Sequence, residues 1–166
     1  MAMSDINVGY ATVTYGGASL GETEGEVTVE ITTQRVMQSS DTYGAETPYD
    51  MIEIGRQMKV TVPLSEYAIA TMQKILQTEV TENGKLEIGR VVGASTRAFA
   101  AKLVVHPVIK GSNTGSDIVI HKAVVSSETI SAIFANDARN PIEVEFTALL
   151  DTGNTEGVLG YIGTPA

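Results

Sequence analysis

The stretch Glu-Thr-Glu-Gly-Glu-Val-Thr-Val-Glu-Ile, residues 22–31, decides the fold class of this chain. Acidic side chains take alternate positions, and apolar or small residues stand between most of them. A period of two is typical of a β-strand with one buried face. We therefore expect a half-buried strand over 22–31, with Val27, Val29 and Ile31 facing inward. Its exposed face would carry a row of carboxylates, namely Glu22, Glu24, Glu26 and Glu30.

Six further segments have the composition of strands, being rich in Val, Ile, Thr or aromatic residues. They are 10–15, 50–62, 99–109, 118–125, 142–150 and 158–162. In the segment 50–62, the alternation places five side chains on the inward face: Ile52, Ile54, Met58, Val60 and Val62. Asn83-Gly84, between Val80 and Leu86, is the residue pair that most favours a tight hairpin turn.

Residues 66–77 have a helical pattern. Ser65 is placed as the N-cap, with Leu64 and Ile69 as a hydrophobic staple across it. Ile69, Met72 and Leu76 recur at helical spacing and form one apolar stripe. The sequence thus predicts a mainly β fold: a β-sandwich or barrel of two packed antiparallel sheets, with one flanking helix at about 66–77. Residues 32–49 are rich in polar residues, and we expect a long loop or hairpin there.

Length and charge limit the classes of function. A chain of 166 residues fits one domain spanning 1–166. It has no cysteine, which fits a reducing cytoplasm, and neither a secretory signal nor a bilayer-spanning apolar run is visible. The net charge is −9, and residues 1–50 alone carry −7, with Arg35 as their one basic residue. Because a negative surface repels phosphate, stable nucleic-acid binding is disfavoured.

The sequence contains no arrangement of residues that supports catalysis. His106 and His121 lack the partners and spacing of a zinc site, so we expect ordinary strand positions and no metal. Ser112, Ser126 and Ser127 have no nucleophile-elbow context, and the glycines form no phosphate-binding loop. Alternate glutamates are spaced compatibly with glycosidase carboxylates, but a chain without Trp is poor in side chains for a sugar cleft. We expect a protein that is not an enzyme and binds no cofactor.

Seven segments follow one another in an order that is more specific than any of them alone. They are Gly17–Gly25 leading into Val27–Glu30, Asp41–Gly44 with Thr47-Pro48, Gly55 before Lys59–Glu66, Val91–Gly93, Ala101–Pro107, Asp117–Val124 and Glu143–Asp151. In this order the chain resembles phage tail tube (major tail) proteins, which share a fold with the tube protein of type VI secretion systems. The resemblance extends over nearly the whole chain.

The resemblance implies hexameric rings that stack into a tube, with the inner sheets of six subunits joined around a channel. It also implies a place in the virion tail after synthesis in the host cytoplasm. The partners would be tape-measure, tube-initiator and tail-terminator proteins, and a sheath if the tail is contractile. The 32–49 segment would be an arm between subunits or rings, with contact residues Arg35, Met37, Asp41, Tyr43, Pro48 and Tyr49.

In such a tube, the glutamate row of 22–31 would line the channel and repel DNA as it passes. Alternatively, this row faces the outer solvent. A second class of protein also stays open, namely a carbohydrate- or ligand-binding β-sandwich such as an adhesion module. The low aromatic content of 5% and the absence of Trp speak against that class. Glycan binding by a stable monomer would favour it, and ring or tube formation would favour the tail tube.

Overall fold

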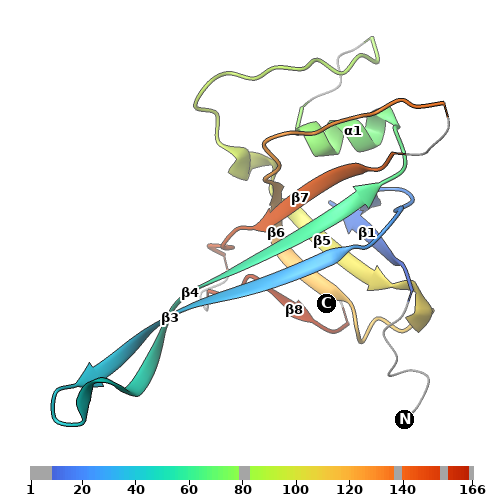
Figure 1. Ribbon diagram of the computed structural model, residues 1–166. Coiled ribbons are helices and arrows are strands. Elements are labelled where there is room, and N and C mark those ends of the chain that lie inside the picture. The colour runs from blue at the N-terminus through green and yellow to red at the C-terminus, as the bar shows by residue number, and fades with distance from the viewer. Residues whose placement is uncertain (1–8, 79–82, 137–139, 154–156, 165–166) are drawn as a thin grey trace.

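Figure 1 shows the fold in a computed structural model that describes residues 9–78, 83–136, 140–153 and 157–164. Its strands are β1 (Ala11–Tyr15), β2 (Ala18–Ser19), β3 (Thr28–Ser40), β4 (Gly44–Leu64), β5 (Ala101–Pro107), β6 (Ile118–Val125), β7 (Ile142–Ala148) and β8 (Gly160–Ile162). An α-helix, α1 (Ile69–Leu76), follows β4, and two short 3-10 turns flank β5, η2 (Thr96–Phe99) and η3 (Val108–Lys110).

The strands form one antiparallel sheet in the order β2-β1-β5-β6-β7-β4-β3. One edge of β6 pairs with β5, and its other edge pairs with β8 in the first half of the strand and with β7 in the second half. The sheet curls until segment 20–24 joins its two sides. The Leu20 amide donates to the Val13 carbonyl of β1 (2.9 Å), and the Glu24 amide donates to the Pro63 carbonyl of β4 (3.1 Å). The result is a barrel whose wall is closed by an irregular segment.

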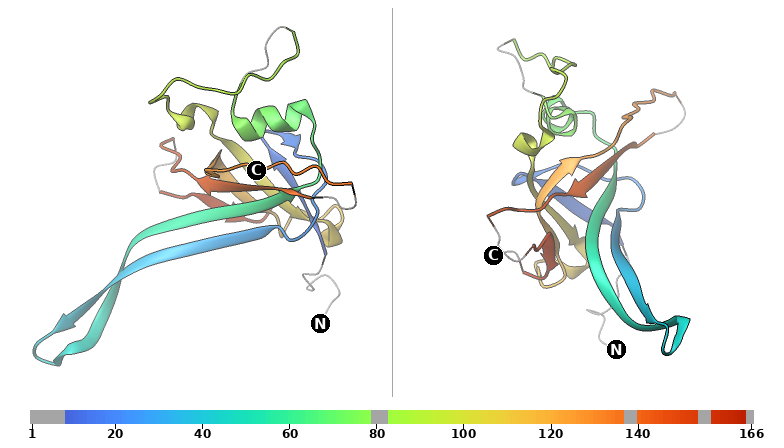
Figure 2. Two further views of the ribbon diagram at one scale, coloured as in Figure 1. Left: turned by 45° about the horizontal axis from the view of Figure 1, so that its top comes forward. Right: turned by 90° about the vertical axis from the view of Figure 1, so that its left-hand side faces the viewer.

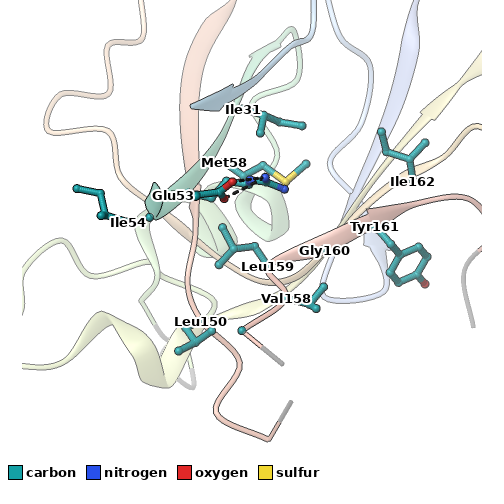
Figure 3. Close-up of a pocket in the computed structure, with 13 residues that line it drawn as sticks. Ile31, Glu53, Ile54, Met58, Leu150, Val158, Leu159, Gly160, Tyr161 and Ile162 are labelled. Carbon is teal, nitrogen blue, oxygen red and sulfur yellow. Dashed lines mark hydrogen bonds and ion pairs between the residues drawn. The ribbon is translucent and has the colours of Figure 1, made fainter. Parts of the chain in front are cut away.

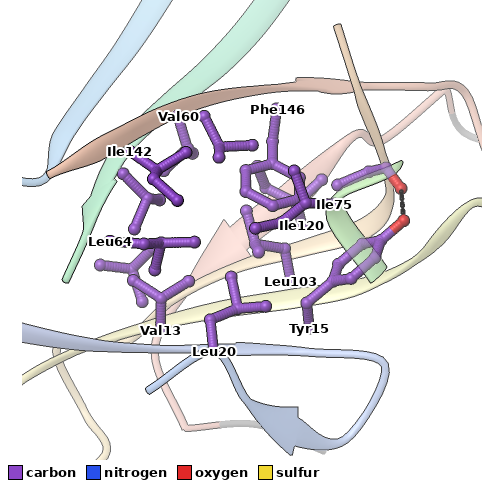
Figure 4. Packing of buried hydrophobic residues seen from close by; sticks show 14 of the residues in the cluster. Val13, Tyr15, Leu20, Val60, Leu64, Ile75, Leu103, Ile120, Ile142 and Phe146 are labelled. Carbon is purple, nitrogen blue, oxygen red and sulfur yellow. Dashed lines mark hydrogen bonds between the residues drawn. The ribbon is translucent and has the colours of Figure 1, made fainter. Parts of the chain in front are cut away.

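Apolar side chains that the strands point inward fill this barrel (Figure 4). Phe146 of β7 is fully buried, and its ring centroid lies 5.1 Å from that of Tyr15. The Tyr15 hydroxyl donates to the carbonyl oxygens of Phe99 and Ala123, at 2.7 and 3.0 Å, so its polar end is satisfied inside the core. The helix α1 lies across one end of the barrel and adds Ile75 to the core (Figure 1).

The predicted mainly β fold with one helix is confirmed within the described ranges. The strand predicted over 118–125 coincides with β6, and those at 10–15, 99–109, 142–150 and 158–162 differ from β1, β5, β7 and β8 only at their ends. The prediction of two packed sheets differs from the structure in one respect, because the strands on the two sides of the core belong to one continuous sheet. Residues 32–49 lie in the hairpin of β3 and β4, which is one of the two predicted forms.

The strand predicted over 22–31 begins only at Thr28. Gly25 has a φ of 114°, outside the range of extended strands, and the chain bends there. The alternation of exposure survives nevertheless, because Val27 and Val29 are half-buried while the glutamates are exposed. Ile31, which was predicted to face inward, is exposed because the hairpin leaves the barrel at that point.

The helix begins at Ile69 instead of 66, and Ser65 does not cap it. The Ser65 hydroxyl donates to the Glu22 carbonyl (3.0 Å), and the N-cap position is taken by Ala68 without a side-chain bond. Ile69, half of the predicted staple, is exposed. The buried helical side chains are Thr71, Met72 and Ile75, so the predicted stripe is rotated. Val80, which the Asn83-Gly84 hairpin needs, lies outside the described residues, and that hairpin stays a prediction.

Candidate assembly surface

The hairpin of β3 and β4 continues past the barrel as a two-stranded arm, residues 32–57 (Figures 1 and 2). β4 pairs with β7 only from Lys59 to Leu64, and β3 is the last strand of the sheet. Along the arm, therefore, neither outer edge has a strand partner among the described residues. An unpaired edge is a hydrogen-bonding template for another chain, and an isolated two-stranded hairpin is marginally stable in water.

Apolar side chains lie on both faces of the arm. Val36 is the cross-strand partner of Ile52, and Met37 is the partner of Met51. Because successive strand residues point to opposite faces, each face carries one of these pairs. Their exposed fractions run from 44% for Ile52 to 65% for Met37. Clustered exposed apolar side chains of this kind mark interaction surfaces.

The six residues predicted for contacts between subunits all lie on this arm, and all are exposed. Arg35 lies opposite Glu53, and Pro48 lies opposite Ser39. Tyr49 donates from its hydroxyl to the Gln38 side-chain oxygen (3.2 Å). Asp41 and Tyr43 belong to the turn at the tip, and Met37 forms the pair described above.

Ile52 and Ile54 were predicted to face the core, and this was wrong, since both are exposed on the arm. A register shift opposite Gln34 and Arg35 leaves Ile54 without a cross-strand partner, which is a β-bulge. Sequence alternation identifies one face of a strand but does not say what covers that face. The sequence analysis therefore missed Val36, Met51, Ile52 and Ile54 as surface residues, although the same period-two pattern contained them.

The four glutamates of the predicted acidic row are all exposed, but they do not share one strand. Glu22 and Glu24 lie in the segment that closes the barrel, and Glu26 lies in the irregular segment after Gly25. Glu30 alone is in β3, opposite Lys59 of β4. The row is therefore divided at the bend.

Next to Glu30, the outward face of β4, β7 and the end of β6 is polar. The Lys59 ammonium binds the Glu145 carboxylate at 3.0 Å, and the Ser126 hydroxyl donates to the same oxygen at 2.9 Å. Both contacts lower the pKa of Glu145, that of Lys59 more strongly. Thr147 donates to Ser126 in turn (2.7 Å). These groups satisfy one another and present no activated nucleophile.

A groove of ≈ 870 Å³ lies where the arm leaves the barrel (Figure 3). Ile54 comes from the arm, and Ile31 and Met58 form the cross-strand pair next to it. Leu159 and Tyr161 come from the C-terminal segment. Its lining combines aliphatic side chains with the ion pair of Glu53 and Arg56, and Tyr161 is its one aromatic ring. The groove thus offers little of the aromatic surface that a sugar site would use for stacking.

His106 is held between two acceptors at the turn that joins β5 to β6. Its Nδ1 lies 2.5 Å from the buried Asp117 carboxylate, and its Nε2 lies 2.8 Å from the Gly111 carbonyl oxygen. Only the imidazolium can donate from both nitrogens. The bond to Asp117 is the main cause that raises the pKa of His106. The pair of His106 and Asp117 therefore holds this turn in place. The ring centroid of His121, by contrast, lies 5.4 Å from that of Tyr161.

In the part of the chain that the structure describes, no three potential ligand side chains are grouped to hold a metal ion. Within the same ranges, no helix has the length and apolarity that crossing a bilayer requires. Compared with known proteins, the chain matches no protein-family model and no curated protein. The arm is therefore the feature of the described structure from which a function can best be argued.

Proposed function

We propose that this chain is a structural subunit that assembles into stacked hexameric rings and forms the tube of a phage tail. The observation that carries the proposal is the arm at residues 32–57, which has apolar pairs on both faces and no strand partner at either edge within the described ranges. A hairpin of this kind is stable only when another element covers it. Copies of the same chain supply that cover at every position of a ring, without a second protein.

The acidic segment 22–30 gives the proposed channel its character. Its four exposed carboxylates follow β4 along the barrel, from Glu30 opposite Lys59 near the arm to Glu22 and Glu24 at the far end of the strand. If this side lines the channel, it repels phosphate and lets DNA pass without binding. Changing Glu22, Glu24, Glu26 and Glu30 to Lys should then give assembled tubes that retain DNA at low salt and release it at high salt. Variant tubes that ignore DNA would place this row on the outer wall.

The assembly itself is tested by negative-stain electron microscopy of the purified protein, together with its mass in solution over a range of concentrations. We expect rings or tubes with a central hole, and a mass that rises with concentration. A protein that stays monomeric at every concentration contradicts the proposal. Binding of such a monomer to a glycan array would instead favour the adhesion-module class.

A further inference from the structure

The arm tip has a complementary surface at the opposite end of the same molecule. Residues 83–98 form a loop beside α1 that ends within η2, and in all three views of Figures 1 and 2 this loop and the arm tip point away from each other. Because the two surfaces lie at opposite ends, they can meet only between two copies. We propose that the arm tip of one copy docks on the 83–98 loop of the next copy. This inference rests on the proposed function, since it names the surface that receives the arm.

Charge is the first argument for this pairing. The arm tip, residues 36–52, carries Asp41, Glu46 and Asp50 and no basic residue. The 83–98 loop carries three basic residues and one acidic residue, a net charge of +2 within a chain of net charge −9. The opposite charges of the arm tip and the loop favour this pairing. The like negative charges of two arm tips disfavour contact between them.

Exposed apolar side chains are the second argument. Ile88, Val91 and Val92 of the loop are 86%, 82% and 100% exposed. Leu86 is the only side chain from 83 to 98 that is half-buried rather than exposed. Loops usually have polar tips, and an apolar loop tip without cover inside its own chain indicates a contact with another one. The arm tip offers Met37, Met51 and two tyrosines to such a contact.

The loop is held in shape by its own contacts, which leaves its apolar tip projecting. The Arg90 guanidinium lies over the Phe99 ring, 4.1 Å from its centroid, and donates to the Ser95 carbonyl oxygen. Arg97 donates to the Leu150 carbonyl oxygen at 3.2 Å. Arg90 therefore holds the loop against η2, and Arg97 ties it to the segment after β7, while both residues stay exposed. A surface ordered before contact loses less entropy when it binds.

A head-to-tail contact between different surfaces either closes into a ring or repeats along an axis, depending on the rotation between copies. Because the arm tip and the loop point away from each other, we take the contact to repeat along the tube axis. Copies joined in this way would connect one ring to the next. The contacts within a ring would then use other surfaces, such as the unpaired edge of β3. This separation makes the inference testable apart from ring formation.

The first test introduces a charge at the fully exposed Val92. We expect Val92→Asp to raise the protein concentration needed for tube formation by at least about tenfold, and Val92→Lys to raise it less, because Asp would face the acidic tip. Combining Val92→Asp with Glu46→Lys should restore assembly toward that of the parent protein. The matched control is Ile109→Asp, also at an exposed apolar position, which should assemble like the parent.

The second test uses the absence of cysteine from the chain. Copies with Tyr43→Cys are mixed with copies carrying Val92→Cys and treated with a short bismaleimide. We expect dimers that link one copy of each kind. Mixing Tyr43→Cys with Ile109→Cys provides the control and should give far fewer such dimers.

The outcomes separate the two proposals. If the parent forms tubes while Val92→Asp assembles normally and links to Tyr43→Cys are no more frequent than in the control, the docking site is refuted and the proposed function stands. If Val92→Asp and Val92→Lys act equally and Glu46→Lys rescues neither, the charge pairing is refuted. A parent protein that stays monomeric refutes the proposed function and this inference together.

Discussion

The arm can be removed at a defined point of its own ladder. Gln34 and Gly55 are the last cross-strand partners before the bulge. Replacing residues 35–54 with Asn-Gly therefore joins these partners through a two-residue hairpin turn. The excised stretch contains no buried side chain. We expect the free energy of unfolding of the monomer to change by less than about 1 kcal/mol, as is usual for surface changes.

The effect on assembly should be far larger. The excised stretch carries seven large apolar side chains that are 44–72% exposed: Val36, Met37, Tyr43, Tyr49, Met51, Ile52 and Ile54. Covering the exposed half of such a side chain is worth about 1 kcal/mol, so the set contributes about 7 kcal/mol per arm, or about 10⁵-fold in the association constant. Ordering these side chains at a contact offsets part of that gain. We therefore expect the concentration needed for assembly to rise by at least about 100-fold.

Sedimentation velocity and negative-stain microscopy measure the assembly, and urea unfolding measures the stability of the monomer. A milder variant, Met37→Ser, should weaken assembly in the same direction. Ile162→Ser is its matched control, because Ile162 of β8 is 66% exposed and Met37 is 65% exposed. If the armless protein folds and assembles at the concentration of the parent, the arm is not the assembly surface. If Ile162→Ser weakens assembly as much as Met37→Ser, general loss of apolar surface explains the effect.

Three predictions concern the barrel. Phe146→Ala should lower the free energy of unfolding by about 3–5 kcal/mol, measured by urea denaturation, because it leaves a cavity in a closed core. A loss below about 1 kcal/mol, which is closer to the effect of a surface substitution, would mean that the core collapses into the cavity. Gly160→Ala should lower the melting temperature, since its Cβ would meet the Val119 carbonyl oxygen of the neighbouring strand; an unchanged melting temperature would show that β8 shifts freely. The raised pKa of His106 means that its bond to Asp117 stabilises the fold fully below the unfolded pKa of about 6.5, and that this contribution is lost as pH rises through the folded pKa. Denaturation midpoints at low and high pH should therefore differ less in His106→Gln than in the parent, and equal pH dependence in both would contradict the assignment.

Much of the fold follows from local patterns in the sequence. Hydrophobic alternation identified β6 and most of β1, β5 and β7, because a strand buried on one face needs apolar side chains at every second position. The same pattern predicted the exposed glutamates at 22–30, which stay exposed even where Gly25 interrupts the strand. The polar composition of 32–49 predicted a loop or hairpin, and this segment lies in the hairpin that forms the arm.

Other features depend on contacts between distant residues, and only the tertiary structure decided them. Apart from Arg56, the alternation that buries Met58 and Val60 extends back through Ile54 and Ile52, yet the first two are in the core and the last two are on the arm. The difference is that β7 pairs with β4 only from Lys59 onward, and pairing with a distant strand leaves no local signature. Closure of the barrel by segment 20–24 depends on partners in β1 and β4 in the same way. A sequence pattern thus specifies which face of a strand is apolar, and the neighbouring strands determine whether that face is buried or left for another molecule.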